Sequence, residues 1–432
     1  MEKLLKNANV YLDGKFQKIN IGITSDKISY LGDQSPEAKE VLDYEGKYLL
    51  PGAIDSQVHF REPGLENKED ILHGSKAALL GGITAFFEMP NTKPATTDRY
   101  RLEEKLQIAR KNSVVDYAFY IGATQNNIQE LKYLVKTPGC CGIKTFMGSS
   151  TGNLLLYDKK ELEVMLRENP GTKAFHCEDE DRMIERNSIA TAAKHVSAHP
   201  IWRDETSALL ATQKIVGLAK ATGSRVHVLH VTTKEEMCFL RENKKYASVE
   251  VTPQHLSLHA PDCYERLGTY AQMNPPIRSI DHQEELWRGV VDGTVDVIGS
   301  DHAPHSIEEK SKTYPATPSG MPGVESILPL MLDHVNAGRL SLERVVELLC
   351  VNPIKLFGIQ NRELIAKDAD ATFTVVDMKK EKPFKNHYKC NWSPFEGRKI
   401  KGWPTDVWLH GEHIMQDQQI LRLSSARALS FS

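Results

Sequence analysis

The sequence predicts an α/β fold, a (β/α)8 TIM-type barrel with a small β-sandwich built from the N- and C-terminal segments. Three observations support this prediction. Short apolar runs alternate with longer segments of helical period through the middle of the chain, both ends show short alternating strands instead, and polar residues recur where the apolar runs end. Alternation of strands and helices is typical of parallel α/β folds, and eight such strands close a barrel.

Eight apolar runs have the length and composition of buried strands. They are AIDSQVH (53–59), ITAFFEM (83–89), VVDYAFYIGA (114–123), CGIKTFM (141–147), KAFHCE (173–178), RVHVLHV (225–231), SVEVT (248–252) and VDVIGSD (295–301). Helical stretches lie between most of them, which is the order that a (β/α)8 barrel requires.

The clearest helix is predicted for residues 205–223. Ala211, Ile215, Leu218 and Ala219 recur on one face, and Gly223 provides a stop signal. A further helix is predicted within residues 341–359, after the last strand, so the barrel should end there.

The two ends of the chain have a different rhythm. Residues 4–49 form short alternating runs with turn signals such as Asp13-Gly14, which indicates hairpins. From Asp368 a similar strand pattern returns. Because chain ends often lie close together, we expect residues 1–50 and 359–432 to build one composite sandwich beside a barrel of residues 51–358.

Composition narrows the class of partner. The 432 residues are 40% hydrophobic and 26% charged, with a net charge of -3, so no basic excess suggests nucleic acid or membrane partners. The chain shows no secretory signal and no long apolar span, and its seven cysteines are scattered. We therefore expect a cytoplasmic protein with reduced thiols and a small-molecule substrate.

Polar residues end the apolar strands with regularity. They are His59, Asn91, Lys144, His176, His230, Asn274 and Asp301, taken from the first strand to the eighth. Taken singly, each has an ordinary explanation, such as a hydrogen-bonded structural histidine, a loop lysine or a helix-capping aspartate. Catalytic groups of barrels come from the C-terminal ends of the strands, however, so their joint placement predicts one metal-binding active site.

The stretch DSQVHFREPG, residues 55–64, is central to that site. Gln57 and His59 are two residues apart, so on a strand they face the same side and can share one metal ion. Arg61 follows two residues later, before the Pro63-Gly64 turn.

At this point the motifs resemble a known family. DSQVHFREPG, MPNT (89–92), GIKTFMG, FHCEDE, HVLHVTT, EVTPQH, NPPIR (274–278), GSDHAPH and NPIKLFG are similar to those of dihydroorotases, members of the amidohydrolase superfamily of metal-dependent barrels. The resemblance runs from about residue 5 to residue 420. The metal-binding residues alone would also fit hydantoinases, dihydropyrimidinases and allantoinases, whereas the combination of HFREPG, MPNT, NPPIR and SDHAPH is specific to dihydroorotase-like sequences.

The resemblance implies one or two zinc ions, and we expect two. His59 and Asp301 would bind the first ion, His176 and His230 the second, and Lys144 would bridge them as a carbamate formed with carbon dioxide. Most relatives have a histidine where this chain has Gln57. A glutamine offers only a neutral amide oxygen, a poorer zinc ligand than imidazole, so its role as a ligand stays open.

The resemblance also implies a reaction. A metal-bound hydroxide would attack the cyclic amide of dihydroorotate, with Asp301 as general acid and base, giving N-carbamoyl-L-aspartate in a reversible step of de novo pyrimidine biosynthesis. Arg61, Asn91 and His305 would hold the substrate carboxylate, and Asn274 would contact the ring.

Further expectations concern partners and alternatives. We expect a homodimer, with a possible association with other enzymes of the pyrimidine pathway. The Gly- and Pro-bearing segment of residues 306–323 is a candidate lid. The competing hypotheses are another cyclic amidohydrolase, and a catalytically silent scaffold with the same fold.

Overall fold

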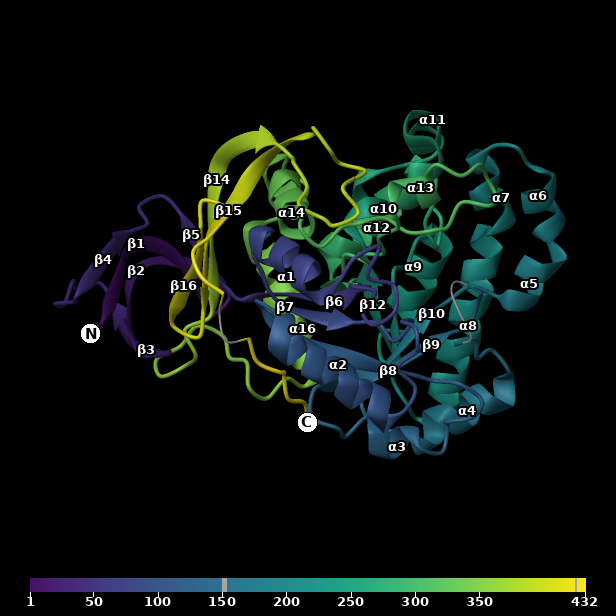
Figure 1. Cartoon of the computed structure of the whole chain (residues 1–432), viewed down its shortest axis with the longest axis horizontal. Helices are drawn as coiled ribbons and strands as arrows, with labels where there is room; N and C mark the ends of the chain where they lie inside the picture. The colour runs from purple at the N-terminus through teal and green to yellow at the C-terminus, as the bar shows by residue number, and fades with distance from the viewer. Residues whose placement is uncertain (150–153, 424–425) are drawn as a thin grey trace.

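The computed structural model describes residues 1–149, 154–423 and 426–432 (Figure 1). A parallel eight-stranded barrel forms its larger part, as predicted. Its strands pair in chain order and are β6 (Ala53–Val58), β7 (Ile83–Glu88), β8 (Asp116–Gly122), β9 (Cys140–Phe146), β10 (Lys173–His176), β11 (Val226–Val228), β12 (Ala247–Val251) and β13 (Val297–Ile298). Between the first and last strands, Val58 bridges to His302, and His59 N donates to His302 O at 2.7 Å. The described chain therefore forms a nearly closed barrel.

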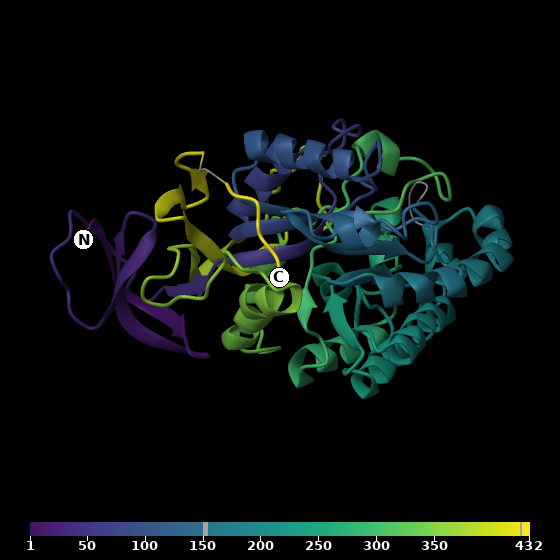
Figure 2. The same cartoon turned by 90° about the horizontal axis from the view of Figure 1, so that it is seen from below.

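Helices surround the barrel strands (Figures 1 and 2). Those of nine residues or more are α1 (Ile71–Leu80), α2 (Arg99–Asn112), α4 (Lys159–Glu168), α8 (Glu205–Thr222), α9 (Lys234–Glu242), α12 (Ile280–Asp292) and α14 (Ile327–Asn336).

Shorter helices occupy the loops and the end of the barrel. They are α3 (Leu131–Leu134), α5 (Glu180–Glu185), α6 (Asn187–Ala192), η1 (Val196–Ala198), α7 (His199–Trp202), α10 (Pro253–Ser257), α11 (Asp262–Leu267), η2 (Gly268–Ala271), α13 (Ile307–Lys310), α15 (Leu342–Val346), η3 (Glu347–Val351) and α16 (Asn352–Phe357). The predicted helix after the last strand is therefore built from α15, η3 and α16 in succession.

Helix α8 forms where the sequence predicts it. The Asp204 side chain accepts a hydrogen bond from Ser207 N at the start, which satisfies a backbone donor that has no partner within the helix. Gly223 ends the helix with φ 71°, a left-handed conformation that favours glycine. The predicted stripe, including Ala211 and Ile215, is buried against the barrel core.

The two ends of the chain together form a second, nine-stranded sheet, which confirms that both termini build one module. Its strands are β1 (Lys3–Leu12), β2 (Lys15–Thr24), β3 (Lys27–Gly32), β4 (Glu40–Asp43), β5 (Tyr48–Pro51), β14 (Phe373–Pro383), β15 (Lys399–Leu409), β16 (Glu412–Gln416) and β17 (Gln419–Ile420). Strand β5 joins the halves, because it pairs with β1 in parallel and with β14 antiparallel. The sheet lies at one end of the molecule, and the barrel at the other (Figures 1 and 2).

Buried apolar residues form separate clusters in the terminal sheet and in the barrel. Leu49, Phe373 and Trp408 belong to the buried core of the terminal sheet. Phe87 of β7 and Phe357 at the end of α16 belong to another buried cluster, with ring centroids 4.8 Å apart. Among the described residues, no helix combines the length and the apolar character needed to span a membrane.

Candidate active site

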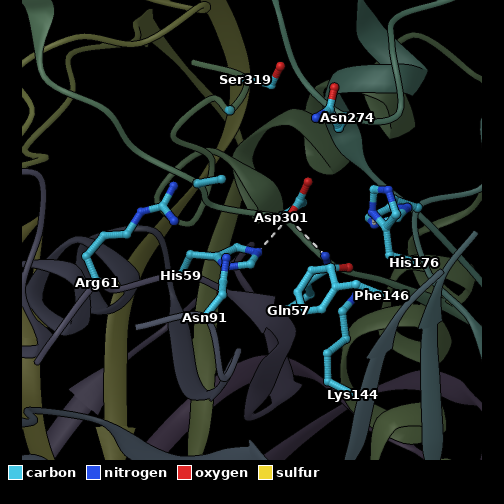
Figure 3. A pocket seen from close by; sticks show the side chains of 13 residues that line it. Gln57, His59, Arg61, Asn91, Lys144, Phe146, His176, Asn274, Asp301 and Ser319 are labelled. Carbon is cyan, nitrogen blue, oxygen red and sulfur yellow. Dashed lines mark hydrogen bonds and ion pairs between the residues drawn. The ribbon is translucent and has the colours of Figure 1, made fainter. Parts of the chain in front are cut away.

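One cavity collects the polar residues at the C-terminal ends of the barrel strands (Figure 3). Its lining residues are Gln57, His59, Arg61, Asn91, Lys144, Phe146, His176, His230, Asn274, Asp301, Ala303, Ser319 and Gly320. Every candidate site residue from the sequence is present except His305, which lines an adjoining cavity. Seven barrel strands or their following loops contribute, so residues far apart in the chain meet at one rim.

Asp301 lies between two residues of the first strand segment. Its Oδ1 accepts a hydrogen bond from Gln57 Nε2 at 2.9 Å and lies 3.1 Å from His59 Nε2 (Figure 3). The second carboxylate oxygen points away from this pair (Figure 3). The Gln57 Oε1 atom is buried and has no hydrogen-bond partner in the described chain. Gln57 and His59 therefore both contact the same oxygen of Asp301.

Asn91 determines which ring nitrogen of His59 carries the proton and which is unprotonated. The Asn91 Oδ1 atom is an acceptor and lies 2.6 Å from His59 Nδ1, so this nitrogen carries the proton. Burial lowers the pKa of His59, which keeps the ring neutral. In this tautomer, the lone pair of His59 Nε2 and the carboxylate of Asp301 face each other. Two such donors facing one point suit a cation between them.

His176 is oriented in a similar way by Glu178. His176 Nε2 donates to Glu178 Oε2 at 2.8 Å, which leaves Nδ1 facing His230 Nε2 at 3.1 Å. Arg203 Nε holds the other carboxylate oxygen of Glu178 at 3.0 Å. Burial alone would raise the pKa of Glu178, but Arg203 and His176 hold it well below its usual range. A buried carboxylate that fixes a histidine in this way is a common support for a metal ligand.

Lys144 of β9 reaches into the same cavity below Phe146 (Figure 3). Its side chain is buried, and Nζ lies 4.5 Å from the centroid of the Phe146 ring. No carboxylate in the described chain pairs with this ammonium group within 4.0 Å. Burial lowers the pKa of Lys144 to about 8.

Arg61 is a second buried cation of the site. Only 4% of the residue is exposed, and Nε donates to Pro304 O at 3.1 Å. Burial lowers the pKa of Arg61 to about 10. No Asp or Glu among the described residues forms an ion pair with it. A buried guanidinium without a carboxylate partner is costly, and this cost indicates a place for an anionic ligand.

His305 and Asn274 border the cavity from different sides. His305 Nε2 lies 3.0 Å from Ser319 O and 3.4 Å from Arg61 Nη2. Burial lowers the pKa of His305 to about 3, so the ring is neutral. Asn274 Oδ1 accepts from His199 Nε2 at 2.9 Å, which leaves the amide NH2 for the cavity. With Lys68 and Lys93, His305 lines the adjoining cavity of about 510 Å³, which also includes Arg61 and Asn91.

Three site residues have strained backbone conformations. Arg61, His230 and Asp301 have φ values of 68°, 36° and 44°, in the left-handed region that non-glycine residues rarely adopt. Each stands just after a barrel strand. Such strain persists only where the surroundings enforce it, and it is concentrated at functional sites.

The donor set fits a metal ion of borderline softness. Burial lowers the pKa values of His176 and His230 as it does for His59, and neutral imidazole is the form that binds metal. In residues 1–149, 154–423 and 426–432, no three His, Cys, Asp or Glu side chains stand together as a metal-binding group. The candidates instead converge in two pairs, His59 with Asp301 and His176 with His230, and Lys144 lines the same cavity. Nitrogen and oxygen donors of this kind suit zinc.

Several functional residues were not predicted from the sequence. Phe146, Ser319 and Gly320 line the cavity, and Glu178 orients His176. Glu178 stands two residues after a strand-end histidine, and this acidic neighbour could have been the signal. The positions of Ser319 and Gly320 depend on how their loop folds back over the barrel, which strand periodicity does not encode.

Known proteins resemble this chain over most of its length. The model of the "Amidohydrolase family" matches residues 48–414. A curated dihydroorotase of Methanosarcina mazei is 35% identical over 434 residues, covering 96% of this chain and 94% of the relative. The dihydroorotase of Methanosarcina acetivorans is 36% identical, covering 96% and 92%. The solved L-hydantoinase (dihydropyrimidinase) of Arthrobacter aurescens has a TM-score of 0.93 at 27% identity, covering 99% of each chain. This chain belongs to the amidohydrolase family.

Proposed function

We propose that this chain is a dihydroorotase, which hydrolyses the cyclic amide of dihydroorotate to N-carbamoyl-L-aspartate and closes the ring in the reverse direction. Its similarity to curated dihydroorotases over nearly the whole chain supports this assignment. The observation that carries it is Arg61, a buried cation without a carboxylate partner in the described chain, beside the candidate metal ligands. The carboxylate on the dihydroorotate ring is a ligand that a guanidinium can hold with two parallel hydrogen bonds.

The metal part of the proposal follows from the paired donors. His59 and Asp301 would hold one zinc ion, His176 and His230 a second, and Lys144, as a carbamate, would bridge them. Because Gln57 Nε2 donates to Asp301 Oδ1, any contact of Gln57 with the first ion would be made through its buried Oε1 atom. When bound, zinc would polarise the substrate carbonyl and lower the pKa of water toward neutrality.

Residues of the chain would carry out proton transfer and would orient the substrate. Asp301 would take a proton from the attacking water on its second carboxylate oxygen and deliver it to the departing ring nitrogen. Gln57 would hold the first oxygen of Asp301 through its amide, so that the carboxylate keeps one orientation. Asn274, anchored by His199, would direct its NH2 group at the ring. Arg61 would fix the carboxylate, and with it the position of the scissile bond.

The alternative cyclic amidohydrolases differ in the charge of the substrate. The ring substrates of hydantoinases and dihydropyrimidinases lack the carboxylate and would leave Arg61 unpaired in a buried position. The adjoining cavity adds Lys93, which forms no ion pair among the described residues and favours an anionic ligand on that side, whereas Lys68 is paired with Glu309. We therefore propose dihydroorotate as the preferred substrate.

The experiment compares wild type and Arg61→Met after loading with zinc and bicarbonate. Loss of two charge-assisted hydrogen bonds should lower kcat/KM for dihydroorotate by roughly a hundredfold to ten-thousandfold. The matched control is Arg288→Met, because the Arg288 side chain is 76% exposed. Unchanged kinetics of Arg61→Met would contradict the carboxylate role. Hydantoin or dihydrouracil turning over better than dihydroorotate would favour the alternative class, and no zinc and no activity would favour a silent scaffold.

Two expectations about assembly stay predictions. These are a homodimer and an association with other enzymes of the pyrimidine pathway. Sedimentation of the purified chain tests the first, and co-purification with the neighbouring pathway enzymes tests the second.

A further inference from the structure

A second cavity lies at the opposite end of the barrel from the candidate active site. It has a volume of about 280 Å³ and is bordered by the starts of β10, β11 and β12 and by the end of α16. Its lining residues are Gly171, Thr172, Lys173, Arg225, Val226, His227, Ser248, Lys355, Leu356, Phe357, Gly358 and Ser432. Strand β10 runs from this cavity at Lys173 to the active site at His176, so the two sites are separated by the length of a strand.

All the charged side chains that line this cavity are basic. Lys173, Arg225 and Lys355 line it, and no Asp or Glu side chain of the described chain does. None of the three forms an ion pair within 4.0 Å among the described residues, whereas buried cations such as Lys105 and Arg203 each have a carboxylate neighbour. Three cations around one cavity, none of them paired with an acidic side chain of the described chain, create a positive potential that attracts an anion.

Lys173 is buried, whereas the cations of an ordinary surface patch are exposed. Only 6% of the residue is exposed, and the hydrogen bond from Nζ to Gly171 O at 3.3 Å is the one polar contact of this ammonium group among described residues. Burial lowers the pKa of Lys173, with no opposing contribution from a nearby acid. A buried ammonium group with one long hydrogen bond is costly, and a bound anion would remove that cost.

We propose that this cavity binds a small phosphate-bearing anion. A phosphate group carries about two negative charges near pH 7, and its oxygens point in several directions, so that one group can contact several cations. A single carboxylate would compensate only one of the three. The volume, slightly below the range typical of drug-sized ligands, sets the size of the anion. This inference does not depend on the reaction proposed for the active site.

Isothermal titration of the full chain with pyrophosphate tests the proposal. We expect saturable binding of one ligand per chain that weakens as salt is raised. Arg225→Met and Lys355→Met should each weaken binding at least fivefold, and Lys173→Met should weaken it further. Because Lys173 is buried, its replacement can disturb folding. In that case the binding measured for Arg225→Met and Lys355→Met, at exposed positions, tests the proposal. The matched control is the exposed Lys15→Met in the terminal sheet, which should bind as wild type does.

Two further titrations distinguish this cavity from the active site and phosphate from carboxylate. Arg61→Met should leave pyrophosphate binding unchanged, since Arg61 lies in the active site. Malonate, which carries two carboxylates, should bind at least tenfold more weakly than pyrophosphate. The proposal is overturned by a lack of saturable binding, by binding that only Arg61→Met abolishes, or by malonate binding as tightly as pyrophosphate.

Discussion

At the scale of single residues, Gln57 is the candidate ligand whose role stays open. Its Nε2 donates to Asp301 Oδ1, an orientation that a carboxylate requires because it can only accept. The same bond turns Oε1 away, and this oxygen is left buried without a partner in the described chain. An unpaired buried acceptor beside His59 is costly unless a ligand uses it.

Replacing Gln57 by histidine should therefore strengthen the first metal position. Imidazole nitrogen is a better zinc ligand than a neutral amide oxygen, so we expect Gln57→His to raise zinc affinity there on the order of tenfold. The measurement is zinc content per chain after dialysis against graded chelator concentrations. Gln57→Asn, which keeps the amide, serves as the control. An identical zinc titration for wild type and Gln57→His would show that residue 57 is not a ligand.

Lys144 supports a second prediction at this scale. The side chain is buried in the cavity without a carboxylate neighbour in the described chain, and a carbamate on Nζ would convert this cation into a ligand for two metal ions. Lys144→Ala should lose at least a thousandfold in kcat, and short carboxylic acids should partly restore activity by occupying the vacated position. Mass spectrometry of the intact wild-type chain in bicarbonate would detect the carbamate. Full activity of Lys144→Ala would contradict the bridge.

At the scale of elements, the loop of residues 306–323 encloses the site. Ser319 and Gly320 line the active-site cavity, whose volume of about 30 Å³ has room for roughly two water molecules. The loop is held by Lys310, whose Nζ donates to Gln272 O and Pro318 O at 3.0 Å and to Gly320 O at 3.1 Å. The loop therefore borders the space that a ring-sized substrate would enter.

Lys310→Met should release the loop. The substitution keeps the apolar stem but leaves Pro318 O and Gly320 O without a donor, at a cost of about 1–3 kcal/mol for each group that stays buried, while Gln272 O keeps its hydrogen bond from Gly320 N. We expect faster hydrogen exchange of amides in residues 311–320, together with a higher KM. The control is Lys312→Met on the exposed side of the same loop. Equal exchange rates in Lys310→Met and wild type would show that other contacts hold the loop.

The strands themselves were predictable to the extent that their apolar runs are regular. Each of the eight predicted runs overlaps a barrel strand, because a parallel strand covered on both faces requires a continuous apolar run. Strands β11 and β13 are shorter than predicted, since the chain turns away with positive φ at His230 and Asp301 soon after each. The candidate site residues lie at the ends of strands. There, positive φ values interrupt the regular strand pattern.

The site was predictable in its members but not in its contacts. The strand-end rule identified His59, His176 and Asp301, which share one cavity. Pairings such as Glu178 with His176 depend on side-chain directions after the strand has ended. His305 was predicted beside the carboxylate, and in the structure its ring nitrogen lies 3.0 Å from Ser319 O. That contact depends on the fold of a loop with no periodic pattern.

At the scale of the whole molecule, a buried ionic cluster joins the terminal sheet to the barrel. His410, which follows β15, lies 3.0 Å from Asp116 of β8 through Nε2 and 2.9 Å from Asp370 through Nδ1. Arg362 Nη1 donates to the other oxygen of Asp116 at 2.7 Å. The two parts of the chain are therefore tied by charge as well as by apolar packing.

This cluster predicts a pH dependence of stability. Burial alone would lower the pKa of His410, but hydrogen bonds to Asp116 and Asp370 raise it to about 9. A raised pKa in the folded state stabilises the protein fully below the unfolded pKa of about 6.5, by about 3 kcal/mol, and this contribution is lost as pH rises toward 9. His410→Gln should therefore destabilise the protein at pH 6 and have little effect above pH 9. The measurement is the difference in urea unfolding midpoint between wild type and variant from pH 6 to 9.5, with the exposed His195→Gln as control. A difference that stays constant across this range would mean that His410 is not protonated in the folded protein.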